Sequence, residues 1–370
     1  MSHTLSPAAS PDTGGGRSPA PRSARERQVS DFTALTAKVQ EHGLMRRAYG
    51  YYWSKLVGLT VAGLVLAGTF VHMGDTWWQL STAVVLALLM TQIAFLGHDA
   101  AHRQIFVSGR WNEWVSLIVV NLFAGMGLGW WQRKHTKHHA APNQVDADPD
   151  IDSGVLALTP QAAAGRTSRL GRWLATKQGW FFFPLLLLEG VNLHVQGLKR
   201  VLGRDRVKRR WVELSFIGFR LLSYVALVFV ILPPGKAAAF IGVQLAVFGL
   251  YMGLSFAPNH IGMPIVPPTV KIDFLRRQVL MSRNITGGRW VDTFMGGLNF
   301  QVEHHLFPSM ARPNLRKVAP MVRAYCEQLG VRYTETSIGQ SYKAVHDYIN
   351  RVGRGGLDVW ACPLATQYRV

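Results

Sequence analysis

Two long apolar segments without a charged residue constrain most strongly how this chain folds. Residues 56–71 carry no charge, and residues 77–97 continue for 21 residues without one. A helix rises about 1.5 Å per residue, so about 20 apolar residues cross the hydrocarbon core of a bilayer, which is about 30 Å thick. Only the short run from His72 to Thr76 separates the two segments. We therefore expect two antiparallel helices that cross a membrane and return.

A second pair of apolar segments follows later. Residues 214–232 and 236–256 are joined by a Pro-Pro-Gly sequence, which favours a turn. Arg220 interrupts the first of them, near its basic end, where a long side chain reaches the interface. Two further stretches, 114–132 and 180–198, are apolar but ambiguous, because their length permits either a crossing or an interfacial helix.

Seven of the thirteen histidines fall into three short motifs next to these apolar segments. The motifs are HDAAH at 98–102, HTKHH at 135–139 and QVEHH at 301–305. Residues three and four apart share one face of a helix, so each motif gathers its imidazoles. Imidazole is the commonest nitrogen ligand of iron, zinc and copper, and seven are too many for one tetrahedral site. We predict two metal ions with the ligands His98, His102, His135, His138, His139, His304 and His305.

The positions of the motifs bear on the membrane topology. They follow residues 97, 132 and 256, so a single site requires that these three ends share one side of the membrane. The basic loop 199–210 is expected to be cytoplasmic. We predict an all-α, multi-pass membrane fold, with four transmembrane helices as two hairpins, interfacial or re-entrant helices and a cytoplasmic helical cap. Both termini and the histidine motifs are then cytoplasmic, whereas six crossings would separate the motifs.

Composition separates the ends of the chain from its middle. Residues 1–30 are rich in Pro, Gly, Ser and Ala and are expected to be disordered; residues 31–315 form the membrane domain, and residues 316–370 a cytoplasmic C-terminal segment. The net charge is +19, yet the sequence contains no nucleic-acid-binding module, so we expect a lipid bilayer rather than nucleic acid as the partner of this charge. Cys326 and Cys362 are expected to be ordinary reduced thiols.

The motifs also indicate which metal is bound. A zinc peptidase typically has His-Glu-x-x-His, and neither His98 nor His135 is followed by Glu. An imidazole-rich site with open positions is typical of iron that activates O2. Because hydrocarbon C–H bonds resist acid–base chemistry, such a centre also suits a lipid substrate.

In their order and spacing, the three motifs resemble those of the membrane fatty acid desaturases of the acyl-lipid and acyl-CoA type, over residues 90–315. The third motif lies in GLNFQVEHHLFP at 297–308, which looks like the family's third histidine box. The resemblance implies a non-haem di-iron centre, O2 as co-substrate and removal of two hydrogens from a fatty acyl chain. It also implies electrons from a ferredoxin or a flavoprotein–cytochrome b5-type chain. The His-Pro-Gly-Gly motif of a fused cytochrome b5 domain is absent, so we expect a separate donor.

The resemblance suggests further residues near the metals. His260, after Asn259, stands where related enzymes place an additional ligand; the alternative is a polar pair that caps the preceding helix. The third box often begins with His, whereas Gln301 stands here, as in the branch that includes front-end desaturases, and its ligation stays open. His194 lies within an apolar stretch and is either functional or bonded to a backbone carbonyl.

Acidic residues beside the motifs are candidates for orienting the ligands. We expect Asp99 and Glu303 to hold ligand imidazoles by hydrogen bonds rather than to bind metal. The segment 146–150 resembles an Asp-Pro-Asp segment of the family, and we favour a solvated turn there over a structural role near the metals.

Three alternative functions remain open. A lipid hydroxylase on the same scaffold differs only late in the reaction. A membrane zinc hydrolase requires zinc and a general base. A metal transporter requires polar residues inside the spanning helices that could bind the metal. The few polar side chains in residues 56–71 and 77–97 are Thr, Ser and Gln.

Overall fold

The computed structural model describes residues 24–152 and 154–356. The segment predicted to be disordered, 1–30, lies mostly outside these residues, and its last seven residues begin helix α1 (Ala24–Glu41). Cys362 and residues 357–370 of the predicted C-terminal segment also lie outside the described residues.

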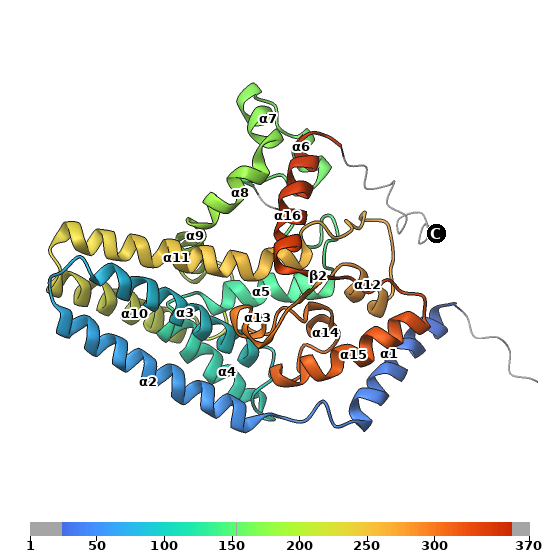
Figure 1. Ribbon diagram of the computed structural model, residues 1–370, viewed down its shortest axis with the longest axis horizontal. Helices are drawn as coiled ribbons and strands as arrows, with labels where there is room; N and C mark the ends of the chain where they lie inside the picture. The colour runs from blue at the N-terminus through green and yellow to red at the C-terminus, as the bar shows by residue number, and fades with distance from the viewer. Residues whose placement is uncertain (1–23, 153, 357–370) are drawn as a thin grey trace, which may run out of the picture.

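Four long apolar helices form one end of the molecule, shown at the left of Figure 1. They are α2 (Tyr49–Met73), α3 (Gln79–Ala101), α10 (Arg210–Ile231) and α11 (Pro234–His260). Each is long and apolar enough to cross a membrane. These helices correspond to the four predicted segments and form two hairpins, so the all-α membrane fold is confirmed.

The two ambiguous stretches form sharply bent helix pairs. Helix α4 (Gly109–Leu117) and the π-helix η1 (Ile118–Phe123) meet α5 (Leu128–Ala140) at 119°. Helix α8 (Gln178–Leu186) meets α9 (Glu189–Leu202) at 71°. By length and composition each pair is a broken span or a re-entrant loop.

Short helices and one small sheet cover the opposite end, shown at the right of Figure 1. The remaining elements are α6 (Pro160–Ala164), α7 (Arg169–Thr176), α12 (Phe274–Leu280), α13 (Arg289–Phe294), α14 (Gln301–Leu306), α15 (Arg312–Gln328), α16 (Ile338–Gly353), β1 (Asn284–Thr286) and β2 (Glu335–Ser337). The two strands pair in parallel, with Asn284 opposite Glu335. The largest buried cluster packs α1, α12, α14 and α15 together, with Leu35, Leu275, Val302 and Val318 at its centre.

This packing brings helix ends together at the base of the cap. Helix α3 packs against α2 and α11, and α11 also packs against α9. Gly190 of α9 and Gly249 of α11 touch through their backbones, and a Cβ at either position would overlap the other helix. Small residues at such a crossing let two helices approach closely in a membrane. As a result, the C-terminal ends of α3, α5 and α11 converge below α14.

Candidate metal centre

Histidines from four helices meet between the spanning helices and the cap. His98 and His102 lie at the end of α3, three histidines at the end of α5, His260 at the end of α11 and two on α14. Their ring nitrogens form two groups, within each of which the candidate ligand atoms lie within 4.8 Å of one another. The first group is His98, His102, His135 and His304, and the second is His138, His260 and His305. The three motifs therefore converge, as the sequence predicts, and His260 joins them.

Close contacts between Nε2 atoms connect the first group. The Nε2 atoms of His102 and His135 lie 2.8 Å apart. His139 contributes as well, because its Nε2 lies 3.0 Å from that of His135 and 3.1 Å from that of His304. The ring of Trp131 stacks on His135 with the centroids 4.4 Å apart, which covers one side of this group.

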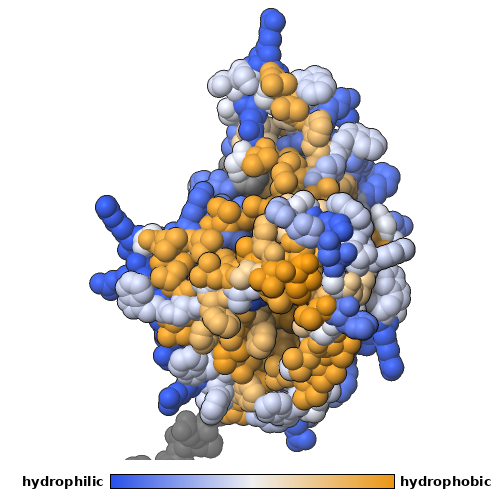
Figure 2. All heavy atoms as spheres, turned by 90° about the vertical axis from the view of Figure 1, so that its left-hand side faces the viewer, coloured by the Kyte–Doolittle hydropathy of each residue, from blue (hydrophilic) through white to orange (hydrophobic). Residues whose placement is uncertain are grey.

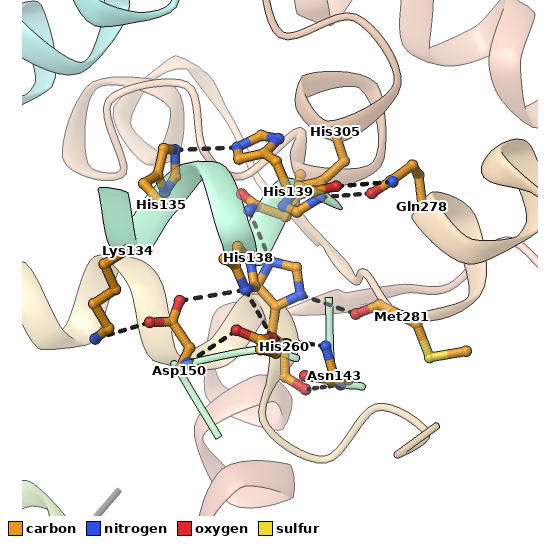
Figure 3. Close-up of polar contacts among 12 residues, drawn as sticks. Lys134, His135, His138, His139, Asn143, Asp150, His260, Gln278, Met281 and His305 are labelled. Atoms are coloured by element: carbon orange, nitrogen blue, oxygen red, sulfur yellow. Dashed lines mark hydrogen bonds and ion pairs between the residues drawn. The ribbon is translucent and has the colours of Figure 1, made fainter. Parts of the chain in front are cut away.

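In the second group, the Nε2 atoms of His138 and His260 face each other at 3.2 Å. The ring centroids of His305 and His260 lie 4.8 Å apart. His139 stacks on His305 with a centroid distance of 4.2 Å, so it lies against both groups. Figure 3 shows these side chains, with His138 and His260 below His139 and His305.

The pitch of α5 explains why one motif serves two groups. Each residue turns a helix by about 100°, so side chains four apart diverge by about 40° and side chains three apart by about 60° in the other direction. His135 and His139 therefore point to the first group, whereas His138 points to the second. The expectation that this motif presents one common face holds only for His135 and His139.

Hydrogen bonds at Nδ1 fix the orientation of the second group. The Nδ1–H of His138 donates to the Asp148 carboxylate at 2.9 Å, and that of His260 donates to the Met281 carbonyl at 2.9 Å. The Nδ1–H of His305 donates to the Gln278 side-chain carbonyl at 2.8 Å. A proton held at Nδ1 leaves the lone pair of Nε2 free to bind a metal, which is the usual arrangement for a ligand histidine.

The nitrogen positions fit metal ions. Two imidazole nitrogens bound at right angles to one ion, each at about 2.1 Å, lie about 3 Å apart. The measured Nε2–Nε2 distances of 2.8 to 3.2 Å agree with this spacing. Moreover, the Nε2 atoms of His98 and His305 are buried without any hydrogen-bond partner, one in each group. A buried polar atom without a partner is costly, and a cation bound in each group would satisfy the Nε2 atom there.

The electrostatics of α14 keep its histidines in the metal-binding form. Burial lowers the pKa of His304 and of His305 well below 6.5, and the neighbouring histidines lower it further. Both rings are therefore neutral at pH 7, and neutral imidazole is the form that binds metal. These two uncharged imidazoles can therefore each hold a metal ion, one in each group.

Asp148 and Asp150 correct the expectation of a solvated turn at 146–150. Asp148 is only 2% exposed and also accepts a hydrogen bond from the backbone N–H of Asn143 at 2.7 Å. Asp150 lies 3.3 Å from His138 Nδ1 and pairs with Lys134 at 2.8 Å (Figure 3). The resemblance of this segment to the family's Asp-Pro-Asp segment indicated a structural role near the histidines, and the structure agrees with that alternative rather than with a solvated turn. Gln278 and Met281, by contrast, carry no sequence signal, because they reach the site only through the tertiary fold.

Glu303 does not hold a ligand imidazole, contrary to the sequence interpretation. Its carboxylate accepts hydrogen bonds from Tyr333 at 2.6 Å and from Asn284 at 2.7 Å, on the side facing the cap. Burial raises the pKa of Glu303 to about 7, although these two hydrogen bonds act in the opposite direction. Glu303 precedes the two histidines on a short helix, so its side chain points away from the faces that they use.

The remaining predicted neighbours differ in their roles. Asp99 lies 3.5 Å from His98 Nδ1, but its closer partner is Arg312, at 2.7 Å. The Gln301 side-chain nitrogen lies 2.8 Å from His260 Nε2, so Gln301 contacts the second group directly. Asn259 donates to the Gln301 side-chain carbonyl at 3.1 Å and reaches the group only through Gln301. His194 belongs to neither group, and its Nδ1–H donates to the Gly190 carbonyl at 2.7 Å, which was one of its two expected roles.

A cavity of about 270 Å³ adjoins the second group. Its polar lining includes His138, His260 and Gln301, together with Lys134, His135, Asn143, Asp150 and Glu189, while Phe182 and Met252 belong to its mostly apolar wall. It opens into a wider cleft of about 1070 Å³, with which it shares Trp130, Lys134 and Asp150. A mostly apolar cavity beside a group of histidines suits a hydrocarbon ligand.

Comparison with known proteins agrees with this geometry. The sequence pattern of the family described as fatty acid desaturase matches residues 75–337. The chain is 31% identical to fatty acid desaturase 3 of Bos taurus over 341 residues, which cover 90% of this chain and 74% of that protein. It is 28% identical to the delta(8)-fatty-acid desaturase of Helianthus annuus, with 85% and 72% covered, and 30% identical to an acyl-lipid (9-3)-desaturase of Physcomitrium patens, with 84% and 60% covered.

The matched region includes all three histidine motifs, His260 and the spanning helices α3, α10 and α11. The spanning helix α2 lies before it. Desaturation is an oxidation, and the family acts on fatty acyl chains within a membrane. The convergence of the histidines and the similarity along most of the chain lead to the same conclusion: this chain belongs to the fatty acid desaturase family.

Proposed function

We propose that this chain desaturates a fatty acyl chain in an O2-dependent reaction, with two iron ions held by its histidine groups and electrons supplied by a separate donor. The observation that carries the proposal is the pair of histidine groups beside an apolar cavity. When bound, the iron ions would supply the oxidising power that an unactivated methylene requires.

The chain's own residues would position the metals and the substrate. His98, His102, His135, His139 and His304 would hold the first iron, and His138, His260 and His305 the second. Asp148, Gln278 and the Met281 carbonyl orient the rings of the second group. The acyl chain would lie in the cavity along Phe182 and Met252, whose apolar side chains exclude water from the reacting methylenes.

Two observations favour this function over a zinc hydrolase. Hydrolysis requires a carboxylate that is free to act as a general base. Asp148 is committed to His138 and Asp150 to Lys134, while Glu303 points to the cap. Glu189, which also lines the cavity, accepts a hydrogen bond from Asn192 at 3.1 Å. In addition, eight histidines exceed what a single catalytic zinc needs. A lipid hydroxylase would use the same site, and the two reactions differ in their products.

We also propose that the histidine groups and both termini face the cytoplasm. The loop 199–210 holds seven Lys or Arg and one Asp, and lies at the same end of the spanning helices as the histidines. Positively charged loops remain on the cytoplasmic side. Labelling of single cysteines in this loop, and in the opposite loop at residues 74–78, with a membrane-impermeant reagent tests this orientation. Labelling of the 199–210 loop from outside intact cells would reverse it.

The function is tested by expression in a host with a simple lipid profile, followed by fatty acid analysis by mass spectrometry. We expect a new unsaturated fatty acid with the intact chain, and its loss in His98→Ala and His304→Ala. His72→Ala is the matched control, because His72 is exposed at the far end of α2 and should leave the product unchanged.

The purified chain should contain two irons, and its oxygen consumption should depend on an electron donor. A hydroxylated product would favour the hydroxylase instead. Zinc in place of iron, together with no oxygen consumption, would favour the hydrolase and contradict the proposal.

A further inference from the structure

Helices α6, α7 and α8 form an arm that projects from the side of the helical body, at the top of Figure 1. The C-terminal helix α16 holds this arm in place. Gln178 donates to the Ile349 carbonyl at 2.7 Å, and Asn350 accepts from the Gly179 amide at 2.9 Å. Gly353 touches the Ala175 carbonyl so closely that a Cβ there would overlap it. The direction in which the arm points is therefore fixed by specific contacts.

Helix α7 has one side against the protein and an apolar side that the described residues leave uncovered. Ala175 is 6% exposed and faces α16. Leu170, Trp173 and Leu174 are 64%, 56% and 38% exposed and lie together on another side of the helix. Trp180, at the start of α8, is 66% exposed. Apolar side chains grouped in this way on an exposed helix mark an interaction surface.

Positive charges lie next to this apolar side, on α7 and at both of its ends. Arg166, Arg169, Arg172 and Lys177 lie on or beside the helix, and residues 153–188 contain no Asp or Glu. Among the described residues, none of these four cations forms an ion pair. The arm thus combines a Trp- and Leu-containing apolar side with an uncompensated positive charge, the pattern of a helix that lies in a lipid headgroup layer.

The arm also faces the side from which a bilayer would meet it. Figure 2 looks at the molecule from the far end of the spanning helices, and hydrophobic side chains along the projecting arm are visible from that direction. Exposed Leu188, Val191 and Val195 continue the apolar surface along α9, which packs against the spanning helix α11. The apolar side of the arm is therefore continuous with the surface that lipid covers.

We infer that the arm formed by α6–α8 rests on the bilayer, with Leu170, Trp173 and Leu174 among the lipid acyl chains and its cations against anionic phospholipid headgroups. Trp favours this boundary, because its ring is apolar and its N–H is polar. The basic residues would then add attraction to negatively charged lipids. This contact does not depend on the reaction that the histidine groups support.

The inference is tested with the full chain in nanodiscs, one copy per disc. A cysteine is introduced at the apolar side (Trp173→Cys) or, as the matched control, at the neighbouring charged side (Arg172→Cys), each in a Cys362→Ser background. The thiol is labelled with the fluorophore NBD. A chain without an introduced cysteine measures the background from buried Cys326.

We expect NBD at position 173 to emit at shorter wavelength and to be reduced by aqueous dithionite several-fold more slowly than NBD at position 172. Lipids with a shallow spin label should quench the fluorescence only at position 173. The protection should increase when neutral phosphatidylcholine is partly replaced by anionic phosphatidylglycerol, and Arg169→Ser combined with Lys177→Ser should reduce that increase.

Equal dithionite rates at the two positions would overturn the inference, because the arm would then lie in water. Protection that arises only in discs holding two copies would identify a second chain as the partner and would also overturn it. The same protection in neutral and anionic discs would remove the role of anionic headgroups.

Discussion

His138 and Asp148 form a buried pair in which the imidazole Nδ1–H donates to the carboxylate at 2.9 Å. This bond turns the Nε2 of His138 toward that of His260, 3.2 Å away. A carboxylate behind a ligand histidine fixes its tautomer and makes it a stronger donor to the metal. The pair therefore links a loop residue to the second histidine group.

Replacement of Asp148 should weaken metal binding at the second group. Asp148→Asn keeps the shape of the side chain but removes the charge, so we expect affinity for one of two metal ions to fall by about 10- to 100-fold. Metal content after dialysis against a chelator, measured by mass spectrometry, should decrease from two ions toward one. Asp146→Asn, at an exposed position of the same turn, should retain both ions. Equal metal content in the two variants would contradict this role.

The buried ion pair between Asp99 and Arg312 should contribute strongly to stability. Arg312→Met would leave the carboxylate buried without its partner at 2.7 Å, which costs about 3–5 kcal/mol. Thermal unfolding in detergent should show a large decrease in midpoint. Arg316→Met removes an exposed arginine that is also 2.7 Å from its aspartate, Asp292, and should cost only about 0–1 kcal/mol. Similar midpoints for the two variants would show that burial does not govern the effect.

His194 should be dispensable for metal binding. Its Nδ1–H donates to a backbone carbonyl within α9, and it belongs to neither histidine group. His194→Gln should therefore keep the metal content of the unmodified chain, whereas His260→Gln should lose metal from the second group. Metal analysis of both purified variants decides the matter, and loss of metal in His194→Gln would refute the assignment.

The thiol of Cys326 should be inert in the folded protein. Burial raises its pKa to about 12, so at pH 8 the reactive thiolate is scarcely present. In the unfolded chain the thiol ionises near pH 8.5, which means that this group favours folding below that pH and that its contribution is lost as the pH rises toward 12. Alkylation by iodoacetamide at pH 8, followed by peptide mass spectrometry, should modify Cys326 only after denaturation.

Much of the fold was predictable from local sequence. The length of an apolar segment determines whether a helix crosses a bilayer, so the four spanning helices could be located from residues alone. The Pro-Pro-Gly sequence located the turn before α11 in the same way. The spacing of histidines along a helix also predicted that His98 and His102 lie together, and the same is true of His135 and His139, whereas the second and third motifs as a whole are divided between the two groups.

Tertiary structure decided how the histidines are divided and what holds them. The sequence did not show that His138 lies with His260 rather than with His135 and His139, because that depends on where the tertiary fold places the end of α11 relative to the end of α5. It also misplaced Asp148 in solvent and Glu303 beside a ligand.

The physical reason is that helix formation and membrane insertion depend on nearby residues and summed hydrophobicity, which a sequence displays directly. A hydrogen bond between residues far apart in the chain depends on the packing of whole helices. The bond between His305 and Gln278 and that between His260 and the Met281 carbonyl exist only because α12 and the cap pack over the helix ends. The sequence by itself determined the spanning helices and the kinds of side chain at the site, and the packing of those helices decided which histidines lie in the same group.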